Sequence, residues 1–415
     1  MSMDFFNAIS VKEALQIITK LANDYKMDTE VVSLVDAIDR IVAMNYRAPV
    51  NLPQFNRSTV DGYAVMIQDV VDASETSPMP LKLVHEVIMG EVVTDVLKEG
   101  QTVYVPTGGM LPEKTEGMVM IEYTKQLDEE TILIKKPVQE GENISYTGDD
   151  LSLGEVYIKA GKRITAYDLG LFASMGVGQI EVYKKPVFSI ISTGDEIIGI
   201  DEEQSFGQIR EINSYALGGL IKQLGGEVNK RKIVKDDFGK IRSALEETLV
   251  LSDIILVSGG SSVGKKDYTR QVIESFDNSQ IWVHGIAIKP GRPTIFGQVE
   301  GKLVVGLPGH PASALVTFSL FVKRYFLTIQ KSRQEVVHIK AMLTGDVYAA
   351  QGRETYQMVR LSRKADIWEA LPLYGKSGMM TLLAKASGYI KIPFEKEKFE
   401  KGTFVDVYLL KDLTL

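Results

Sequence analysis

The chain has 415 residues, so we expect two to four domains rather than one hydrophobic core. Its hydrophobic content of 45% and charged content of 24% are typical of a soluble globular protein, and its net charge of −7 argues against broad nucleic-acid binding. Cysteine is absent, which excludes disulfides and thiolate chemistry. No leader and no run of about 18 apolar residues is visible, so we expect a cytoplasmic protein without a membrane partner.

The first half of the chain predicts helices followed by a β-rich region. Apolar residues at helical spacing predict a helix over Val11–Tyr25, and a second short helix is expected over Val31–Arg40. Between Val50 and Gly154, short β-rich runs alternate with proline and glycine turns and predict a small β domain; the runs are Leu81–Val87, Thr102–Val105, Met118–Glu122 and Thr131–Ile134. A helix is expected again over Ala166–Ser174.

From Lys185 to about Gln330, strands and helices alternate. Strands are expected at Val187–Ser192, Val228–Val234, Asp253–Val257 and in a hairpin of Thr294–Val299 with Lys302–Leu307. Helices are expected at Asn213–Leu224, Phe238–Leu249 and Pro311–Thr328. This alternation predicts a largely parallel sheet covered on both faces. The β-rich remainder after Ser332 predicts a C-terminal β domain of about 80 residues.

A glycine-rich loop follows the strand that ends at Val257, and it is the most informative segment of the sequence. It reads Ser258-Gly259-Gly260-Ser261-Ser262-Val263-Gly264-Lys265-Lys266-Asp267. Such a loop leaves backbone N–H groups free for an anion, at the sheet edge where α/β proteins bind ligands. It lacks the hydroxyl that a P-loop needs at Lys266, and Gly264 and two lysines separate Ser262 from the helix that a nucleophile elbow requires. An anion-binding loop is therefore favoured, with a turn that binds nothing as the alternative.

Acidic residues follow three consecutive strands of this region. They lie in Ser192-Thr193-Gly194-Asp195-Glu196, in Val234-Lys235-Asp236-Asp237 and at Asp267. Each could simply cap a helix, because Asp and Thr are favoured there. Taken together, carboxylates beside a phosphate loop are how proteins hold magnesium against a phosphate.

Two proline-rich turns lie at the same predicted edge. Lys289-Pro290-Gly291-Arg292-Pro293 sets a cation on each side of a rigid turn, which suits an anion. Leu307-Pro308-Gly309-His310-Pro311 precedes a helix. Rigid turns with solvated charges are the alternative interpretation of both.

Taken together, these segments resemble the molybdopterin molybdenumtransferase (MoeA) family, to which the gephyrin E domain is related. The segments that match, in the family's order, are Val60-Asp61-Gly62-Tyr63-Ala64, Pro106-Thr107-Gly108, Gly148-Asp149-Asp150, Ser192 to Glu196, Asp236-Asp237, Ser258 to Gly264, Asp267-Tyr268-Thr269, Lys289 to Pro293, Leu307-Pro308-Gly309 and Ser377-Gly378-Met379. They span essentially the whole chain.

The resemblance implies a multidomain α/β and β fold with four parts. Residues 1–27, 46–54 and 155–183 would form an elongated N-terminal domain, and residues 55–154 an inserted β domain. Residues 28–45 and 184–332 would form a three-layer α/β molybdopterin-binding domain with a mostly parallel sheet, and residues 333–415 a C-terminal β-barrel. The family acts as homodimers whose cleft is shared between subunits, which would bring Asp61 and Thr107 to the acidic strand ends in trans.

The implied reaction inserts molybdate into adenylylated molybdopterin, with magnesium-dependent cleavage of the adenylate and release of AMP and molybdenum cofactor. Its implied catalytic residues are Asp61, Thr107, Glu196, Asp236, Asp267 and Lys289, of which Glu196, Asp236 and Asp267 would bind Mg²⁺. Its implied substrate-binding residues are Asp150, Ser192, Thr193, Gly194, Asp195, Ser258, Gly259, Gly260, Ser261, Ser262, Gly264, Pro290, Gly291, Arg292, Pro308 and Pro311. A molybdopterin adenylyltransferase and molybdoenzymes are the implied protein partners.

The sequence departs from the family's pattern at three positions. Ser145 and Gly285 stand where some members have an arginine and a lysine, so anion contacts by those side chains do not transfer to this chain. His310 stands where asparagine is common. Two alternatives stay open: a non-enzymatic scaffold of the gephyrin type, and tungstate in place of molybdate, because the two oxyanions are nearly isosteric.

Overall fold

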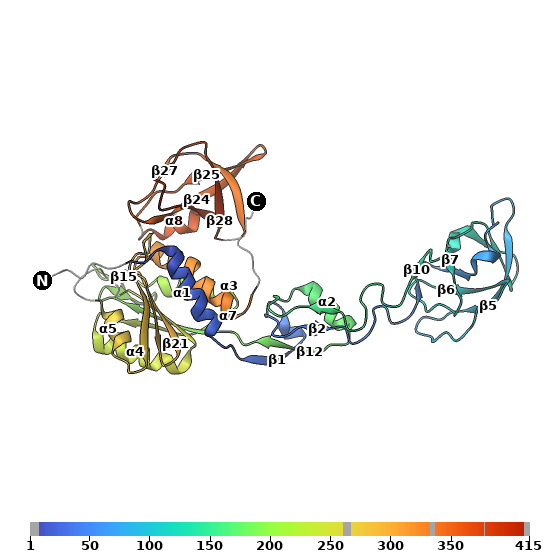
Figure 1. Ribbon diagram of the computed structural model, residues 1–415, viewed down its shortest axis with the longest axis horizontal. Helices are drawn as coiled ribbons and strands as arrows, with labels where there is room; N and C mark the ends of the chain where they lie inside the picture. Colours follow the sequence, from blue (N-terminus) through green and yellow to red (C-terminus); the bar gives the residue numbers. More distant parts are fainter. Residues whose placement is uncertain (1–7, 260–266, 333–336, 377, 411–415) are drawn as a thin grey trace.

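A computed structural model describes residues 8–259, 267–332, 337–376 and 378–410 of the chain. The molecule is elongated and has four parts (Figure 1). The α/β domain and a C-terminal β domain lie at one end, and a small β domain lies at the other. A narrow module that contains helix α2 (Ala166–Ser174) connects them. The expected fold class is confirmed.

The α/β domain is built on a six-stranded sheet of order β16-β13-β17-β21-β20-β18. Its strands are β13 (Val187–Thr193), β16 (Glu227–Val234), β17 (Ile254–Ser258), β18 (Ser279–His284), β20 (Ile295–Val299) and β21 (Lys302–Leu307). The first four strands in this order are parallel, and β20 and β18 are antiparallel to their neighbours. The short strands β14 (Ile197–Ile198) and β15 (Ile209–Arg210) pair outside it. The expected hairpin is therefore part of the central sheet.

Helices cover both faces of this sheet. One face packs against α1 (Val11–Asp24), α3 (Asn213–Gln223), α6 (Pro311–Thr317) and α7 (Lys323–Ile329). The other packs against α4 (Phe238–Leu251) and α5 (Tyr268–Glu274). Strand residues are buried on both sides because alternate side chains point to opposite faces: Ile190 contacts the first group of helices and Ile191 the second.

A π-helical turn, η4 (Phe318–Val322), joins α6 to α7 into one long apolar helix. By length and composition alone, Pro311–Ile329 could cross a membrane. However, 61% of its most apolar window is buried inside the protein, and Phe318, Phe321 and Phe326 belong to the core of the α/β domain. Packing therefore accounts for its apolar composition.

The connecting module is assembled from two distant parts of the chain. Strand β1 (Thr29–Ser33) pairs with β12 (Gln179–Tyr183), and β2 (Tyr46–Arg47) pairs with β11 (Val156–Ile158). These strands, with the short 3-10 helix η1 (Val35–Ala37) and α2, enclose a small core around Phe172.

Two expectations for the N-terminal region are wrong. The helix expected over Val31–Arg40 is instead strand β1 followed by η1, because β12 offers these residues an antiparallel partner. The assignment of residues 1–27 and 28–45 to domains is reversed. Helix α1 buries Ala14 and Ile18 in the α/β core, and residues 29–42 contribute Ala37 and Val42 to the core of the connecting module.

The small β domain is inserted in the sequence between the two segments that form the connecting module. Its sheet has the order β7-β4-β6-β5-β9-β8. The strands are β4 (Gly62–Val65), β5 (Met79–Glu86), β6 (Gln101–Val105), β7 (Gly117–Met120), β8 (Thr124–Gln126) and β9 (Thr131–Ile134), with 3-10 turns η2 (Ile67–Asp69) and η3 (Ile121–Tyr123). The pair β3 (Arg57–Ser58) and β10 (Ile144–Ser145) leads into it. Three of the four expected β-rich runs are confirmed as strands, and the fourth, Met118–Glu122, is a strand only to Met120 because the chain then turns into η3.

The C-terminal domain contains a closed five-stranded barrel. Its strands follow the order β24-β25-β22-β28-β26, and β26 pairs again with β24. The elements are β22 (His338–Leu343), β23 (Val347–Tyr348), β24 (Glu354–Lys364), β25 (Ile367–Pro372), α8 (Met380–Lys385), β26 (Gly388–Ile392), β27 (Lys398–Phe399) and β28 (Phe404–Leu409). The strand β19 (Ile288–Lys289) of the α/β domain adds to β24 from outside.

Candidate functional site

The carboxyl ends of β13, β17 and β21 define the candidate site. The chain leaves β13 toward β16 on one side and later returns to β17 on the other, so the strand order reverses between β13 and β17. At such a switch point the connections diverge and leave a crevice for ligands. Thr193, Ser258 and Leu307 end the three strands, and all three are buried.

Gly259 brings the glycine-rich loop into contact with the end of β13. Its φ is +103°, and a Cβ atom there would lie 2.4 Å from the Thr193 carbonyl oxygen and 2.8 Å from Thr193 Oγ1. Only glycine allows this approach. The predicted ligands Gly260, Ser261, Ser262 and Gly264 lie outside the described residues, so their role stays a prediction.

The predicted acidic residues have different surroundings. Asp195 and Glu196 are exposed beyond β13. Asp236, beyond β16, has a buried Oδ1 with no hydrogen-bond partner. Its neighbour Asp237 caps helix α4 by accepting a hydrogen bond from Lys240 N, as the simpler interpretation expected.

Both oxygens of the Asp267 carboxylate have protein partners. Oδ1 accepts a hydrogen bond from Arg270 N and caps α5, while Oδ2 lies 2.9 Å from Nε2 of His284, at the end of β18. Within the described parts of the chain, no three His, Cys, Asp or Glu side chains form a cluster ready to hold a metal. The carboxylate oxygens suit magnesium chemically, and the unpartnered Asp236 oxygen fits a ligand role, but the three expected ligands are not grouped in this structure.

The structure adds a buried polar cluster that the sequence analysis missed. The Glu211 carboxylate, 4% exposed, accepts hydrogen bonds from Ser192 Oγ at 2.8 Å, Ser214 N at 2.7 Å and Ser214 Oγ at 2.5 Å. Asn213 Nδ2 donates to Ser258 Oγ at 2.7 Å and to the Gly309 carbonyl at 2.8 Å. Asn213 thus links the start of α3 to two strand ends. Its position directly before a helical pattern was the only available signal.

The cation-bearing turn lies between the α/β domain and the barrel. Lys289 ends β19, which pairs with β24, and its side chain is exposed. The Lys289–Pro290 peptide is cis. Gly291 has a φ of +113°, and a Cβ atom there would lie 2.5 Å from Thr317 Oγ1, so both the backbone conformation and the close contact favour glycine. Arg292 is half-buried.

The neighbouring proline turn starts helix α6. Pro308 and Pro311 are buried, and Pro311 occupies the first position of α6. His310 is exposed at the N-cap and makes no capping hydrogen bond. The prolines therefore shape the backbone beside Gly309 and Asn213, rather than offering side-chain donors.

A second set of predicted residues lies in the small β domain. Asp61 Oδ1 accepts hydrogen bonds from Thr107 N at 2.7 Å and Thr107 Oγ1 at 3.0 Å, so these two exposed residues form one unit. Asp150 is exposed near the junction with the connecting module. Within one chain, the Asp61–Thr107 unit and the α/β edge lie at opposite ends of the molecule (Figure 1).

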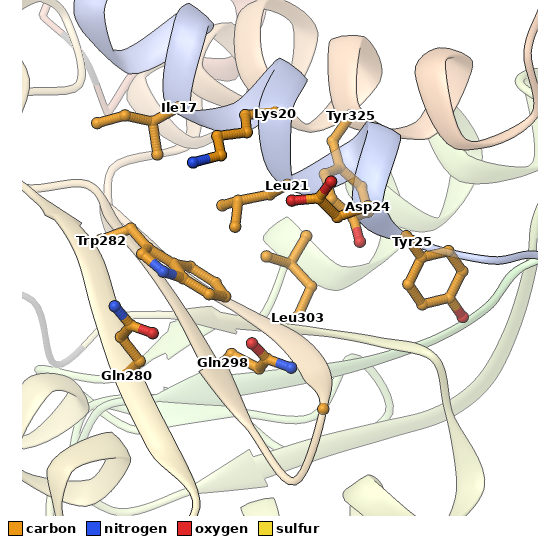
Figure 2. A pocket seen from close by; sticks show the side chains of 11 residues that line it. Ile17, Lys20, Leu21, Asp24, Tyr25, Gln280, Trp282, Gln298, Leu303 and Tyr325 are labelled. Atoms are coloured by element: carbon orange, nitrogen blue, oxygen red, sulfur yellow. The ribbon is translucent and has the colours of Figure 1, made fainter.

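Two grooves lie away from this edge. One, of about 580 Å³, separates α1 from strands β18, β20 and β21; Figure 2 shows Ile17 and Leu21 facing Trp282 across it. A larger groove, of about 1560 Å³, lies between α1, α7 and the barrel. None of the predicted site residues lines either groove.

Comparison with known proteins identifies the family. The profile of the MoeA N-terminal region (domains I and II) matches residues 9–176, that of a "Probable molybdopterin binding domain" matches 189–328, and that of the MoeA C-terminal region (domain IV) matches 340–410. A Methanocaldococcus jannaschii protein named for molybdopterin biosynthesis is 35% identical over 98% of this chain and 99% of its own. The chain belongs to the MoeA family.

Similarity to other MoeA proteins extends over the full fold. A MoeA crystal structure from Pyrococcus horikoshii has a TM-score of 0.86 and 33% identity, and covers 98% of this chain and 100% of its own. A Haemophilus influenzae protein named molybdopterin molybdenumtransferase is 31% identical over 92% of this chain and 94% of its own. The resemblance inferred from the sequence is confirmed, including its place among the enzymes of molybdenum cofactor biosynthesis.

Proposed function

We propose that this protein inserts molybdate into adenylylated molybdopterin, cleaves the adenylate and releases AMP and molybdenum cofactor. The observation that carries the proposal is the concentration of unpartnered buried polar atoms at one sheet edge. Among the described residues five such atoms occur, and three of them (Thr193 Oγ1, Asn213 Oδ1 and Asp236 Oδ1) belong to residues at or beside the carboxyl ends of β13, β17 and β16 respectively. Buried polar groups are almost always paired, so this concentration indicates a ligand site.

The charges around this edge suit the proposed substrates. Molybdate and the substrate's phosphates are anions, and Lys289 and Arg292 supply positive charge on the neighbouring turn. Ser145 and Gly285 offer no charge where some relatives have arginine and lysine. In this chain, Lys289 and Arg292 therefore have the larger share of molybdate binding.

Magnesium is the cation that we propose for the acidic residues. Glu196, Asp236 and Asp267 would hold it, and it would neutralise phosphate charge during cleavage of the adenylate. Asp236 Oδ1 is the best-supported ligand because it has no protein partner. Asp267 can contribute while it keeps its helix-capping role, since each carboxylate oxygen accepts more than one interaction.

We also propose a homodimer in which each cleft is shared. The Asp61–Thr107 unit lies too far along the molecule to be part of the α/β edge of its own chain (Figure 1). Asp61 of the partner subunit would then complete the site. The cytoplasm is the compartment we propose for this reaction, with a molybdopterin adenylyltransferase upstream and molybdoenzymes downstream.

Molybdate-dependent AMP release tests the reaction. Wild-type protein is supplied with adenylylated molybdopterin and Mg²⁺, and AMP is measured with molybdate, with tungstate and with neither. We expect molybdate to stimulate release. AMP release that is the same with and without either oxyanion would refute the proposed activity.

Mixing two inactive variants tests the shared cleft separately. Asp61→Ala and Glu196→Ala should each be inactive as homodimers. A heterodimer of the two has one intact site if the cleft is shared, so random subunit exchange should restore about a quarter of wild-type activity. No recovery, with exchange confirmed by native mass spectrometry, would refute the shared cleft without touching the reaction itself.

A further inference from the structure

The central sheet of the α/β domain ends in two strands whose free edges differ in charge. At one end, β16 carries three consecutive cations, Lys230, Arg231 and Lys232. Charged side chains, above all lysine, keep an edge strand from pairing with another chain. At the other end, β18 has the sequence Ser-Gln-Ile-Trp-Val-His, which contains no acidic residue, lysine, arginine or proline. The edge of β18 therefore lacks this protection and is open to a further strand.

The backbone groups that β18 directs outward follow from its pairing with β20. Glu300 N donates a hydrogen bond to Asn278 O at 2.9 Å, and hydrogen-bonded pairs alternate with non-bonded pairs along an antiparallel ladder. The N–H and C=O groups of Gln280 therefore face β20, whereas those of Ser279 and Ile281 point away from it. Within the described residues, no strand pairs with this outer side of β18.

The same edge already accepts extended backbone just beyond the end of β18. Ile9 forms a parallel bridge with Ile286, in which Ile9 N donates to Gly285 O at 3.2 Å and Ala287 N donates to Ile9 O at 2.8 Å. Ala8, the first residue that the structure describes, makes no bridge to β18. The edge thus accepts an added parallel strand, and the six residues of β18 remain available to one.

A partly apolar groove lies beside β18, between this strand and helix α1. Its volume of about 580 Å³ is within the range of ligand pockets, roughly 300–1,000 Å³. Trp282 is the extra residue of a bulge, where two steps along β18 match one step along β20, and bulges re-aim side chains. Its half-buried indole faces Ile17 and Leu21 of α1 (Figure 2). The groove can therefore receive a large apolar side chain from a strand added at this edge.

We infer that β18 and α1 bind an extended peptide segment of a partner protein, which adds to the sheet as a parallel strand and inserts an apolar side chain beside Trp282. In this mode of recognition, backbone hydrogen bonds to the edge strand supply affinity, and a side-chain pocket supplies specificity. Lys20 and Asp24 are exposed on α1 where it lines the groove, and they suit a segment flanked by an acidic and a basic residue.

This surface is separate from the candidate site. The groove includes Gly301, which directly precedes β21, whereas the candidate site lies beyond the other end of that strand, at Leu307. The inference therefore does not depend on the proposed reaction.

The test measures binding of synthetic peptides to the wild-type protein by fluorescence anisotropy. The probe is fluorescein-Lys-Thr-Val-Phe-Val-Thr-Glu-amide, with leucine, tryptophan or alanine in place of phenylalanine in three further peptides. We expect the probes with a large central side chain to bind, and alanine to weaken binding about tenfold through loss of the groove contact.

N-methylation shows whether the peptide binds as a strand. One version of the phenylalanine peptide carries N-methyl groups on both valines, and another carries them on both threonines. Because alternate residues of a strand direct their N–H groups to opposite edges, only one of these pairs can face β18. One version should therefore lose affinity at least tenfold, and the other should bind like the parent peptide.

A pair of substitutions at Ser279 tests the strand edge itself. Ser279→Pro removes one outward N–H, at an edge position where proline is tolerated. Ser279→Ala is the matched control, because it keeps this N–H and removes only the hydroxyl that donates to Phe276 O. We expect the proline variant to bind the phenylalanine peptide about tenfold more weakly, and the alanine variant to bind it like wild type.

The other outcomes overturn the inference. They are no binding of any probe with a large central residue, equal affinity of the two N-methylated versions, or an alanine peptide that binds as well as the phenylalanine peptide. Peptide binding that requires removal of residues 1–7 would assign the edge to the chain itself. Peptide binding that dissociates a dimer in analytical ultracentrifugation would assign it to a second copy of the chain, and either result would overturn a separate partner.

Discussion

Replacing Gly259 by alanine should damage the candidate site through one identifiable contact. The new Cβ would lie 2.4 Å from the Thr193 carbonyl oxygen, a backbone atom that cannot rotate away. Gly207, in the same domain, has a φ of +90° and no atom within 4 Å of a Cβ atom, so it is the matched control. The two substitutions share the backbone strain of a positive φ, and only Gly259→Ala adds a clash.

The magnitudes follow from these two terms. Positive-φ strain costs about 1–2 kcal/mol for a residue with a Cβ atom, so Gly207→Ala should destabilise the domain by about that amount. Overpacking adds about 1–3 kcal/mol, which brings Gly259→Ala to about 2–5 kcal/mol. With a urea dependence of about 2–3 kcal/mol per molar, the midpoints should fall by about 0.5 M and about 1.5 M respectively.

Fluorescence of Trp282 provides the assay. The chain has two tryptophans, and Trp368→Phe removes the one in the barrel, so that Trp282 of β18 reports on the α/β domain alone. Urea unfolding is then compared among the parent, Gly207→Ala and Gly259→Ala. Equal shifts of the midpoint in the two variants would show that the close approach to Thr193 is not a constraint, and would refute the reasoning.

Two further predictions concern carboxylates. His284→Ala removes the partner of Asp267 Oδ2 and should raise the Mg²⁺ concentration needed for half-maximal AMP release by about tenfold. His284→Gln keeps a hydrogen-bond donor and should recover part of this loss. An unchanged Mg²⁺ requirement in both variants would contradict the positioning role of His284. Burial raises the pKa of Asp168, but hydrogen bonds from Lys162 and Thr165 outweigh it and leave that pKa below its ordinary value. The stabilisation by Asp168 is therefore present above its unfolded pKa of about 4 and is lost as the pH falls through its pKa in the folded protein. Asp168→Asn should destabilise the connecting module at pH 7 and match wild type at strongly acidic pH, as measured by urea unfolding at each pH. A difference in stability that does not change with pH would contradict this prediction.

The strands and helices of the α/β domain could be predicted because each carries its own pattern. Buried strands such as Ile254–Val257 are apolar throughout, and α4 repeats apolar residues at helical spacing. The segment Val31–Arg40 shows the limit of this reasoning. Val31 and Val32 fit the pattern of a helix or of a strand, and they form a strand because they pair with residues about 150 positions away in the sequence.

The candidate site was predictable where the sequence itself marks it. The glycine at 259 and the acidic residues after β13, β16 and β17 were found because they follow directly on buried strands, at the carboxyl ends where α/β proteins bind ligands. Glu211 and Asn213 were not found, because they follow the short strand β15 and reach the edge only through packing of α3. Likewise, nothing local in α1 shows that its apolar face belongs to the α/β core.

The way the chain enters and leaves its distal part has a consequence for how the architecture can change. Outgoing and returning segments pair at three successive levels: β1 with β12, β2 with β11, and β3 with β10. At each level the two backbones are already hydrogen-bonded neighbours, so a turn of a few residues could close the chain there. The molecule is thus a series of nested insertions. A unit far from the α/β domain can be lengthened, exchanged or lost, while every unit nearer to the α/β domain keeps its own strand pairing.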